Sequence, residues 1–223
     1  MQAPIATRAA AAGRHLLLEK PVARSRDAAD ALVRAVRGAG VASVVFFTWR
    51  HDPDVTAWLD DMRQRGPVGA EATWFGSIFT DGSPFDTPWR RAPAAALWDV
   101  GPHALSVLVP VLGPVTSVAG AVHDRYGTVR LLLEHDGGAS SAVTLSLSAP
   151  PRAATTTMRV VGPDGWASAT PPRLDSAVLL GRAIDRLVMC VDDDVMEHPL
   201  DAAFGAAVVG VLADADALLG AAR

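Results

Sequence analysis

The amino-acid sequence predicts an α/β protein in two parts. Up to about residue 50 we expect a partial doubly wound fold with a parallel sheet, and beyond it an α/β domain with an open, mainly antiparallel sheet. Two observations support this prediction. Before Pro53, helices alternate with strands that are apolar throughout, whereas after Pro114 short strands follow one another across turn signals.

The first part has the order helix, strand, helix, strand. An alanine-rich helix is expected over 4–12 and a short apolar strand over 14–19. A second helix begins after Ser25, where apolar residues recur at helical spacing, and ends at Gly40. The β-branched and aromatic segment 41–48 then predicts a strand. Strands without polar alternation are typical of a parallel sheet that is covered on both faces.

The second part alternates less regularly. We expect helices over 54–65 and 95–112, a strand over 70–79, and a loop rich in Gly, Pro and Trp at 81–93. Further strands are expected over 115–123, 128–134, 142–149 and 156–162, with Gly137-Gly138 in a hairpin turn. The C-terminus is predicted to be helical over 177–191 and 200–219. Short links between consecutive strands indicate an antiparallel or mixed sheet.

Composition excludes several classes of protein. The formal net charge of −4 does not favour a nucleic-acid or anionic-membrane partner. A single cysteine, Cys190, excludes an internal disulfide framework and a cysteine-rich zinc site, and its apolar neighbours indicate a buried structural thiol. The N-terminus lacks the plan of a signal peptide, and no uninterrupted apolar run reaches about 18 residues. We therefore expect a cytoplasmic protein without a membrane or nucleic-acid partner.

The only lysine marks a first candidate for chemistry. The chain has 19 arginines, and Lys20 stands at the end of the apolar run Leu16–Leu18 within the sequence Glu19-Lys20-Pro21. Lysine is a compact charge whose pKa falls readily on burial, whereas arginine is a broad fork that stays protonated. Lys20 is therefore a candidate for a catalytic role that arginine could not fill. A surface lysine without such a role explains the residue nearly as well.

A second candidate is the pair Asp99 and His103. Four residues apart on a helix, the two side chains would lie on one face, a turn from each other. A carboxylate beside an imidazole can fix its tautomer and make it a usable acid/base group. Such a pair can also simply brace a helix.

Taken together, these motifs resemble the glucose-fructose oxidoreductase/inositol dehydrogenase (Gfo/Idh/MocA) family of NAD(P)-dependent oxidoreductases. The segment Ala12-Gly13-Arg14-His15-Leu16-Leu17-Leu18-Glu19-Lys20-Pro21 is similar to the family block A-G-x-H-V-x-x-E-K-P. Further matches are Arg50 and Pro53 after a strand, the pair Trp89-Arg90, and Asp99, Gly101 and His103 in the pattern D-x-G-x-H-x-x-D. The resemblance extends from residue 3 to the C-terminal helix.

The resemblance implies a fold, a function and roles for these residues. It implies residues 1–50 as the C-terminal part of a nucleotide-binding Rossmann domain, 51–199 as a substrate and oligomerisation domain, and 200–223 as a C-terminal helix. The implied activity acts on a hydroxyl or carbonyl of a sugar, polyol or related small molecule, with NAD or NADP as cofactor and no metal. Lys20, Asp99 and His103 would be catalytic, and the cofactor would contact Glu19, Lys20, Pro21, Trp89 and Arg90. The family also implies a homo-oligomer and an often cis peptide before Pro21.

The sequence departs from the family pattern in ways that matter. No G-x-G-x-x-G occurs in it, Gly38-Ala39-Gly40 ends a helix instead of opening one, and the Glu-Lys-Pro block begins at residue 19. These features predict an N-terminally truncated member. Ser106 replaces the last Asp of the helix motif, Ala94-Ala95 replaces a Gly-Gly pair, and Thr48 replaces a common Asn. An alternative is therefore a non-catalytic module that lacks its own dinucleotide site and pairs with a full-length relative.

Other conspicuous residues are given structural roles. His51 and Asp52 are explained by a helix N-terminus as well as by a ligand, and Asp192-Asp193-Asp194 by a solvated helix end. Trp74, Phe75 and Phe79 are assigned to the sheet core or to a dimer face.

Overall fold

The computed structural model describes residues 2–221, which form two compact units. Unit 1 contains the chain up to Pro53 together with Pro172–Ala213, and unit 2 contains Asp54–Pro171 together with the chain from Asp214. We expected boundaries near residues 50 and 199. The chain instead returns to unit 1 at Pro172, so that the helix over 176–192 folds with the N-terminal segment.

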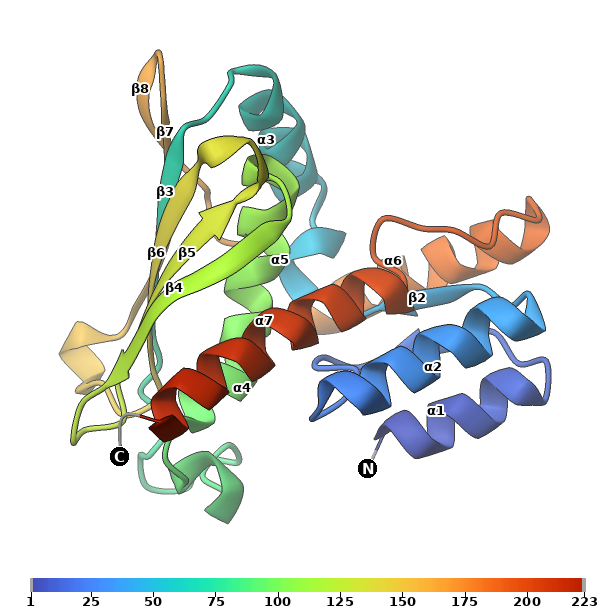
Figure 1. Cartoon of the computed structure of the whole chain (residues 1–223), viewed down its shortest axis with the longest axis horizontal. Helices are drawn as coiled ribbons and strands as arrows, with labels where there is room; N and C mark the ends of the chain where they lie inside the picture. Colours follow the sequence, from blue (N-terminus) through green and yellow to red (C-terminus); the bar gives the residue numbers. More distant parts are fainter. Residues whose placement is uncertain (1, 222–223) are drawn as a thin grey trace. The chain divides into compact units, whose positions relative to one another are not determined.

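Unit 1 contains a small parallel sheet and four helices (Figure 1). Its elements are α1 (Gln2–Ala11), β1 (Leu16–Leu18), α2 (Arg26–Ala39), β2 (Ser43–Val45), the 3-10 turn η1 (Thr48–His51), α6 (Ser176–Asp192) and the first part of α7 (Ala202–Ala221). The strands β1 and β2 pair in parallel, which confirms the partial doubly wound arrangement. Ser25 caps α2 by accepting a hydrogen bond from the Ala28 amide, and Gly40 ends it at a φ of 60°.

The core of unit 1 is built against these two strands. α6 contacts β1, β2 and η1 and buries Leu179, Ala183 and Cys190, so the expected burial of the single thiol is confirmed. Phe47 meets Phe204 of α7 edge to face, with ring centroids 5.4 Å apart. Close approach of α7 also requires a glycine, because a Cβ at Gly205 would lie 2.6 Å from a methyl carbon of Val22.

The strand predicted over 41–48 is too long. It ends at Val45, whose amide donates to the Leu200 carbonyl, while the Phe47 amide turns back to the Val45 carbonyl. Residues Thr48–His51 then form η1. The β-branched and aromatic composition of this segment correctly indicated that it is buried, but it did not indicate the residue at which strand pairing ends.

Unit 2 is an open sheet with helices against one face. Its elements are α3 (Pro53–Gln64), β3 (Gly69–Phe75), η2 (Pro88–Arg91), α4 (Ala95–Asp99), α5 (Gly101–Leu112), β4 (Val115–His123), β5 (Val129–His135), η3 (Asp136–Gly138), β6 (Ser140–Ser146), η4 (Pro151–Ala153), β7 (Thr155–Gly162), β8 (Gly165–Ser168) and the end of α7. The strand order is β4-β5-β6-β3-β7-β8. Within this sheet, as far as the described residues show, β3 and β6 pair in parallel and every other neighbouring pair is antiparallel, so the predicted mainly antiparallel sheet is confirmed.

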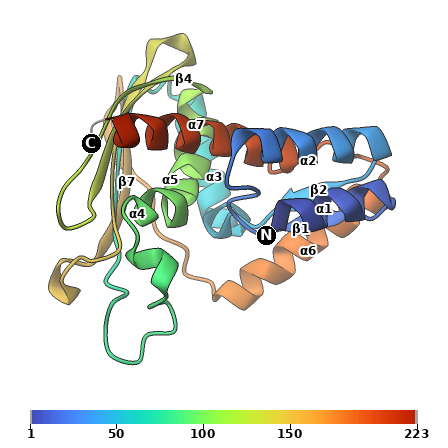
Figure 2. The same ribbon diagram turned by 60° about the horizontal axis from the view of Figure 1, so that its bottom comes forward.

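One face of this sheet is covered and the other is open. Figures 1 and 2 show α3 and α5 on the same side of it. Along β5, Val129, Leu131 and Leu133 are buried while the residues between them are exposed. This alternation is expected of a strand with one face in the core and one toward solvent. Leu132 on the open face is 59% exposed.

Two local features were not fully predicted, and a third was predicted correctly. The helix expected over 95–112 is divided at Val100, because Pro102 has no amide to donate back into the preceding turn. The short strand β8 was not expected, and it pairs with β7 through a tight turn that ends at Gly165. The hairpin turn at Gly137-Gly138 is present, with φ angles of 83° and 85° that favour glycine.

Among the described helices, α7 alone is long and apolar enough to cross a membrane by length and composition. Half of the apolar window is buried inside the protein, as expected of a core helix.

Candidate functional site

The carboxylate of Asp99 is held by an arginine. Asp99 ends α4 and is 8% exposed; its Oδ2 accepts a hydrogen bond of 2.7 Å from Nε of Arg90, and its Oδ1 one of 3.4 Å from Nη2. Arginine can form this two-pronged pair because its donors lie in one rigid plane. The pair keeps the charge of a largely buried carboxylate compensated.

Arg90 itself lies against two aromatic rings. Its Cζ lies 4.4 Å from the ring centroid of Trp89 and 5.7 Å from that of Phe85. A guanidinium over an aromatic face is attracted by the negative charge density of the ring. Trp89-Arg90, assigned to the cofactor on resemblance, thus also fixes the position of Asp99.

The imidazole of His103 lies in the first turn of α5 and stacks on a tryptophan. The rings of His103 and Trp74 are 5.1 Å apart and inclined by 20°. Trp74 comes from β3, so the central strand of the sheet orients the histidine. The expected assignment of Trp74 to the sheet core therefore understated its role: it also forms the platform for a candidate catalytic group.

The serine at the end of the helix motif faces its own helix. Ser106 is fully buried, and its Oγ donates to the main-chain carbonyl of His103 over 2.7 Å. The hydroxyl is thereby used within α5. Trp98, next to Asp99, donates through Nε1 to the Asp216 carboxylate of α7 at 3.2 Å, which ties α4 to the end of the chain.

The turn before α4 keeps a conformation that glycine prefers. Ala94 has a φ of 59° and a ψ of 11°, in the left-handed region. This is the position at which the family pattern has a glycine. Ala94 therefore adopts a backbone conformation that glycine takes freely, at a steric cost of about 1–2 kcal/mol.

The Glu-Lys-Pro segment lies in unit 1, directly after β1. The Lys20–Pro21 peptide is cis, as the resemblance implies. Lys20 is half-buried, and its amide donates to Oε2 of Glu19 at 3.3 Å. The segment is continuous, so Glu19, Lys20 and Pro21 are brought together by the chain itself.

A residue that the sequence did not indicate fixes this segment. The side-chain amide of Gln2 accepts a hydrogen bond from the Glu19 amide and donates one to the Glu19 carbonyl, both of 2.7 Å. The Gln2 side chain therefore satisfies the backbone N–H and C=O groups of Glu19, as a neighbouring β-strand would. No motif marks it, because it is one polar residue at the start of an alanine-rich helix.

The segment between β1 and α2 lacks the features that bind the pyrophosphate of a dinucleotide. Such a site needs glycines that let the phosphates approach amide groups at the start of a helix. Residues 19–25 contain no glycine, and Ser25 uses its hydroxyl to cap α2. This βα connection does not fit a pyrophosphate, so the residues present could meet only other parts of the cofactor.

A buried histidine in unit 1 has a different role from those proposed from the sequence. His51 is 1% exposed; its Nε2 lies 3.1 Å from the Val45 carbonyl, and its Nδ1 lies 3.3 Å from Nη1 of Arg186. A carbonyl can only accept and a guanidinium can only donate, so the ring is neutral with its proton on Nε2. Burial lowers the pKa of His51 to about 4, although the bond to Val45 opposes this and nearby Arg186 favours it. His51 therefore has a structural role, because its ring links η1 to β2 and α6 through these two hydrogen bonds.

The described residues contain no cluster of three or more His, Cys, Asp or Glu side chains that could hold a metal ion.

Comparison with known proteins places this geometry in context. Residues 59–168 match the family model described as the GFO/IDH/MocA C-terminal domain. Levoglucosan dehydrogenase from Pseudarthrobacter phenanthrenivorans is 28% identical over 125 residues, which are 53% of this chain and 32% of that protein. The match therefore spans about a third of the length of this curated relative.

Solved structures share the fold over the whole chain. The structure of GenD2 from gentamicin A biosynthesis in complex with NAD is 22% identical to this chain, with a TM-score of 0.81. The alignment covers 100% of this chain and 74% of the GenD2 chain. Levoglucosan dehydrogenase in complex with NADH and L-sorbose is 19% identical, with a TM-score of 0.81, over 99% of this chain and 75% of its own. At these identities the likeness shows the arrangement of elements alone.

Proposed function

We propose that this protein takes part in the oxidation or reduction of a sugar, polyol or related hydroxyl compound, because residues 59–168 match the model of the GFO/IDH/MocA C-terminal domain and a curated relative is a levoglucosan dehydrogenase. The observation that carries the proposal is the junction of α4 and α5. There Arg90 compensates the buried Asp99 and Trp74 orients His103.

In this proposal the chain handles the proton and orients the substrate. His103 takes the proton from the substrate hydroxyl during oxidation and returns it during reduction, as a general base and acid. Lys20 holds the alcohol oxygen with a compact positive charge that stabilises the developing alkoxide. Asp99, whose charge is compensated by Arg90, stands at the start of α5 and positions His103. A nicotinamide cofactor, when bound, supplies or accepts the hydride.

The proposal is tested by turnover of the intact gene product with NAD or NADP and a panel of sugars and polyols. Lys20→Arg should lose most of the turnover while keeping the fold, because the wider fork cannot occupy the lysine's place at a reacting oxygen. His103→Ala should lower kcat about 100-fold or more. His123→Ala, a change at a histidine of the same unit on β4, is the matched control and should leave kcat unaltered. Near-normal kcat in either site variant would remove the catalytic assignment.

A second candidate is a non-catalytic module that pairs with a full-length relative. It is favoured by the absence of a G-x-G-x-x-G in these 223 residues and by the inward-facing hydroxyl of Ser106. It predicts that the polypeptide of residues 1–223 does not bind NADH with micromolar affinity in calorimetry. Turnover by that polypeptide alone would exclude the second candidate.

We also propose self-association through the open face of the unit 2 sheet. Val122, Leu132 and Trp166 on β4, β5 and β8 are each more than half exposed. Exposed apolar side chains on an open sheet face can pack against those of a second copy across a two-fold axis.

A further inference from the structure

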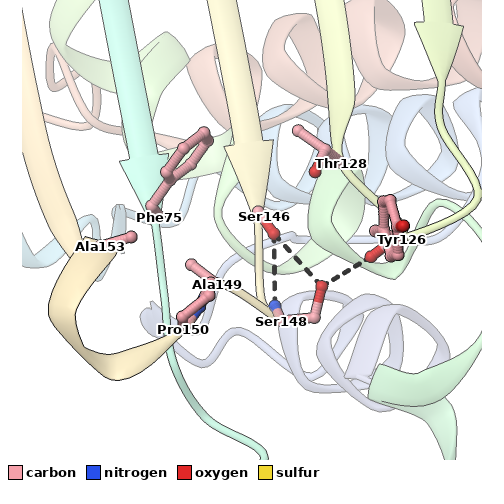
Figure 3. Close-up of a pocket in the computed structure, with 8 residues that line it drawn as sticks. All are labelled: Phe75, Tyr126, Thr128, Ser146, Ser148, Ala149, Pro150 and Ala153. Atoms are coloured by element: carbon pink, nitrogen blue, oxygen red, sulfur yellow. Dashed lines mark hydrogen bonds between the residues drawn. The ribbon is translucent and has the colours of Figure 1, made fainter.

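A cavity of about 420 Å³ opens in unit 2, where β3 and β6 end (Figure 3). Phe75 of β3 and Tyr126 from the turn between β4 and β5 form two of its walls, and Ser146 and Ser148 lie between them. The segment 149–153 closes the remaining side. The size is within the range of about 300–1,000 Å³ that is usual for small-molecule sites.

This cavity is distinct from the candidate catalytic groups. Successive side chains of a strand point to opposite faces of the sheet. Trp74 carries His103 on the helix-covered face, so its neighbour Phe75 points to the open face. Neither Asp99 nor His103 lines the cavity. A ligand bound there would be separated from His103 by the sheet itself.

The hydroxyl groups in the cavity have defined directions. Ser148 Oγ donates to the main-chain carbonyl of Tyr126 over 2.6 Å, which uses its hydrogen. Ser146 Oγ accepts from the Ser148 amide at 3.3 Å and lies 3.4 Å from Ser148 Oγ, at the limit of a hydrogen bond. Because Ser148 has given its hydrogen to Tyr126, Ser146 is the donor in this long contact, and a ligand oxygen nearer to Ser146 can take the place of Ser148 as acceptor, while Ser148 Oγ retains a lone pair to accept from the ligand. The pair suits a ligand that both donates and accepts on neighbouring atoms.

The aromatic wall at Tyr126 is held in place before any ligand arrives. The Asp124 carboxylate accepts hydrogen bonds from the amides of Tyr126 and Thr128, at 2.9 and 3.0 Å, and fixes the turn. Desolvation raises the pKa of Asp124, but these hydrogen bonds and one from Arg130 outweigh it, so the pKa lies below its ordinary value. The wall is therefore built on an ionised, fully engaged carboxylate.

The cavity offers no charge to a ligand. Its described lining contains only apolar and hydroxyl side chains. Of the charged side chains at the same turn, Arg130 pairs with Asp124 at 3.3 Å, and Arg125 donates to the Tyr126 hydroxyl and lies over its ring. Burying an anion here without a partner would be costly.

We propose that this cavity binds a neutral ring with adjacent hydroxyl groups, the chemistry of a monosaccharide or cyclitol. The C–H faces of such a ring pack against Phe75 and Tyr126, while two of its hydroxyls bond to Ser146 and Ser148. The site goes beyond the proposed function, because it lies on the sheet face opposite His103 and does not use Lys20, Asp99 or His103.

The test is ligand binding to the full chain by saturation-transfer NMR and calorimetry. The probes are methyl β-D-glucopyranoside, glucose 1-phosphate as an anionic relative, and phenol as an apolar ring. Saturable binding of the methyl glucoside is expected at tens of millimolar or below. Ser146→Ala and Tyr126→Ala should each weaken it about threefold to tenfold, as for loss of one hydrogen bond or one aromatic contact.

Two further variants locate the binding. Thr144→Ala, a matched loss of a hydroxyl on the same strand and face, should leave the affinity unchanged, and so should His103→Ala. Because the probe needs no cofactor, the result is independent of turnover. The proposal is overturned by the absence of saturable glucoside binding, by binding that responds to His103→Ala but not to Ser146→Ala, by tighter binding of glucose 1-phosphate, or by binding of phenol alone.

Discussion

Acidification should destabilise unit 1 through one buried histidine. His51 is neutral in the folded protein because its ring is buried and its Nδ1 accepts from Arg186. Protonation would place a second positive charge against Arg186 and near Arg50 and His198, which also lower the pKa of His51. The unfolded chain has no such restriction and takes up the proton more readily.

The size of the effect follows from the two pKa values. The pKa of His51 is about 4 in the folded protein, against an ordinary value of 6.5. At about 1.4 kcal/mol for each pH unit, this difference is worth about 3 kcal/mol. Because the folded pKa is the lower one, the stabilisation is complete above pH 6.5 and is lost as the pH falls toward 4. Below pH 4 both states are protonated and no further loss arises from His51.

Urea unfolding followed by circular dichroism at several pH values between 7.5 and 4 measures this profile. His198 and His135 also have pKa values lowered by burial and add losses of the same sign, so the share of His51 must be isolated. His51→Asn removes the titrating group and two hydrogen bonds, and therefore starts from a lower free energy of unfolding. The diagnostic is the change with pH, which should shrink by about 3 kcal/mol. An unchanged pH profile in the variant would refute the conclusion that His51 is buried and neutral in the folded protein.

Three other perturbations have expected outcomes. Ala94→Gly relieves a left-handed alanine and should raise the free energy of unfolding by up to about 1 kcal/mol in urea titrations, since the gain exceeds the entropy cost of glycine; a loss of stability would contradict the strain argument. Gln2→Ala removes both bonds to Glu19 and should speed hydrogen exchange of the Glu19 amide, whereas Gln2→Glu keeps the acceptor and should retain part of the protection; equal rates in all three proteins would exclude the clamp. Leu132→Glu should shift self-association toward monomer in light scattering, while Val178→Glu on α6, an exposed apolar control of similar size, should not; a wild-type monomer at tens of micromolar would remove the proposed interface.

Much of the fold could be predicted because burial repeats with a period along the chain. The alternation of β5 and the unbroken apolar runs at β1 and β2 each encode which faces meet the core. Glycines at Gly40 and at Gly137-Gly138 marked the end of a helix and a turn for steric reasons that are local. Such features require no knowledge of the rest of the chain.

The missed features depend on partners distant in sequence. At the end of β2 the Val45 amide donates to Leu200, a residue far along the chain, and the return of α6 to unit 1 depends on contacts with strands more than a hundred residues earlier. The role of Gln2 arises only once α1 lies beside Glu19. Propensity and spacing do not contain this information, because it is created by tertiary contacts.

The candidate site shows the same division between local and distant information. The four-residue spacing predicted that Asp99 and His103 lie one helical turn apart. The structure shows that Asp99 accepts two hydrogen bonds from Arg90, which lies nine residues earlier and in another element. A carboxylate has about four lone-pair sites, so this pair does not prevent Asp99 from serving a second donor. What changes is the charge. An isolated Asp99 would bring an uncompensated negative charge to a largely buried position, whereas the Arg90–Asp99 pair brings none. The pair Trp89-Arg90 and the Asp-x-x-x-His motif, which the sequence presents as separate signals, therefore act as one unit: the tryptophan holds the arginine, the arginine holds the carboxylate, and the carboxylate stands at the start of the helix that carries His103.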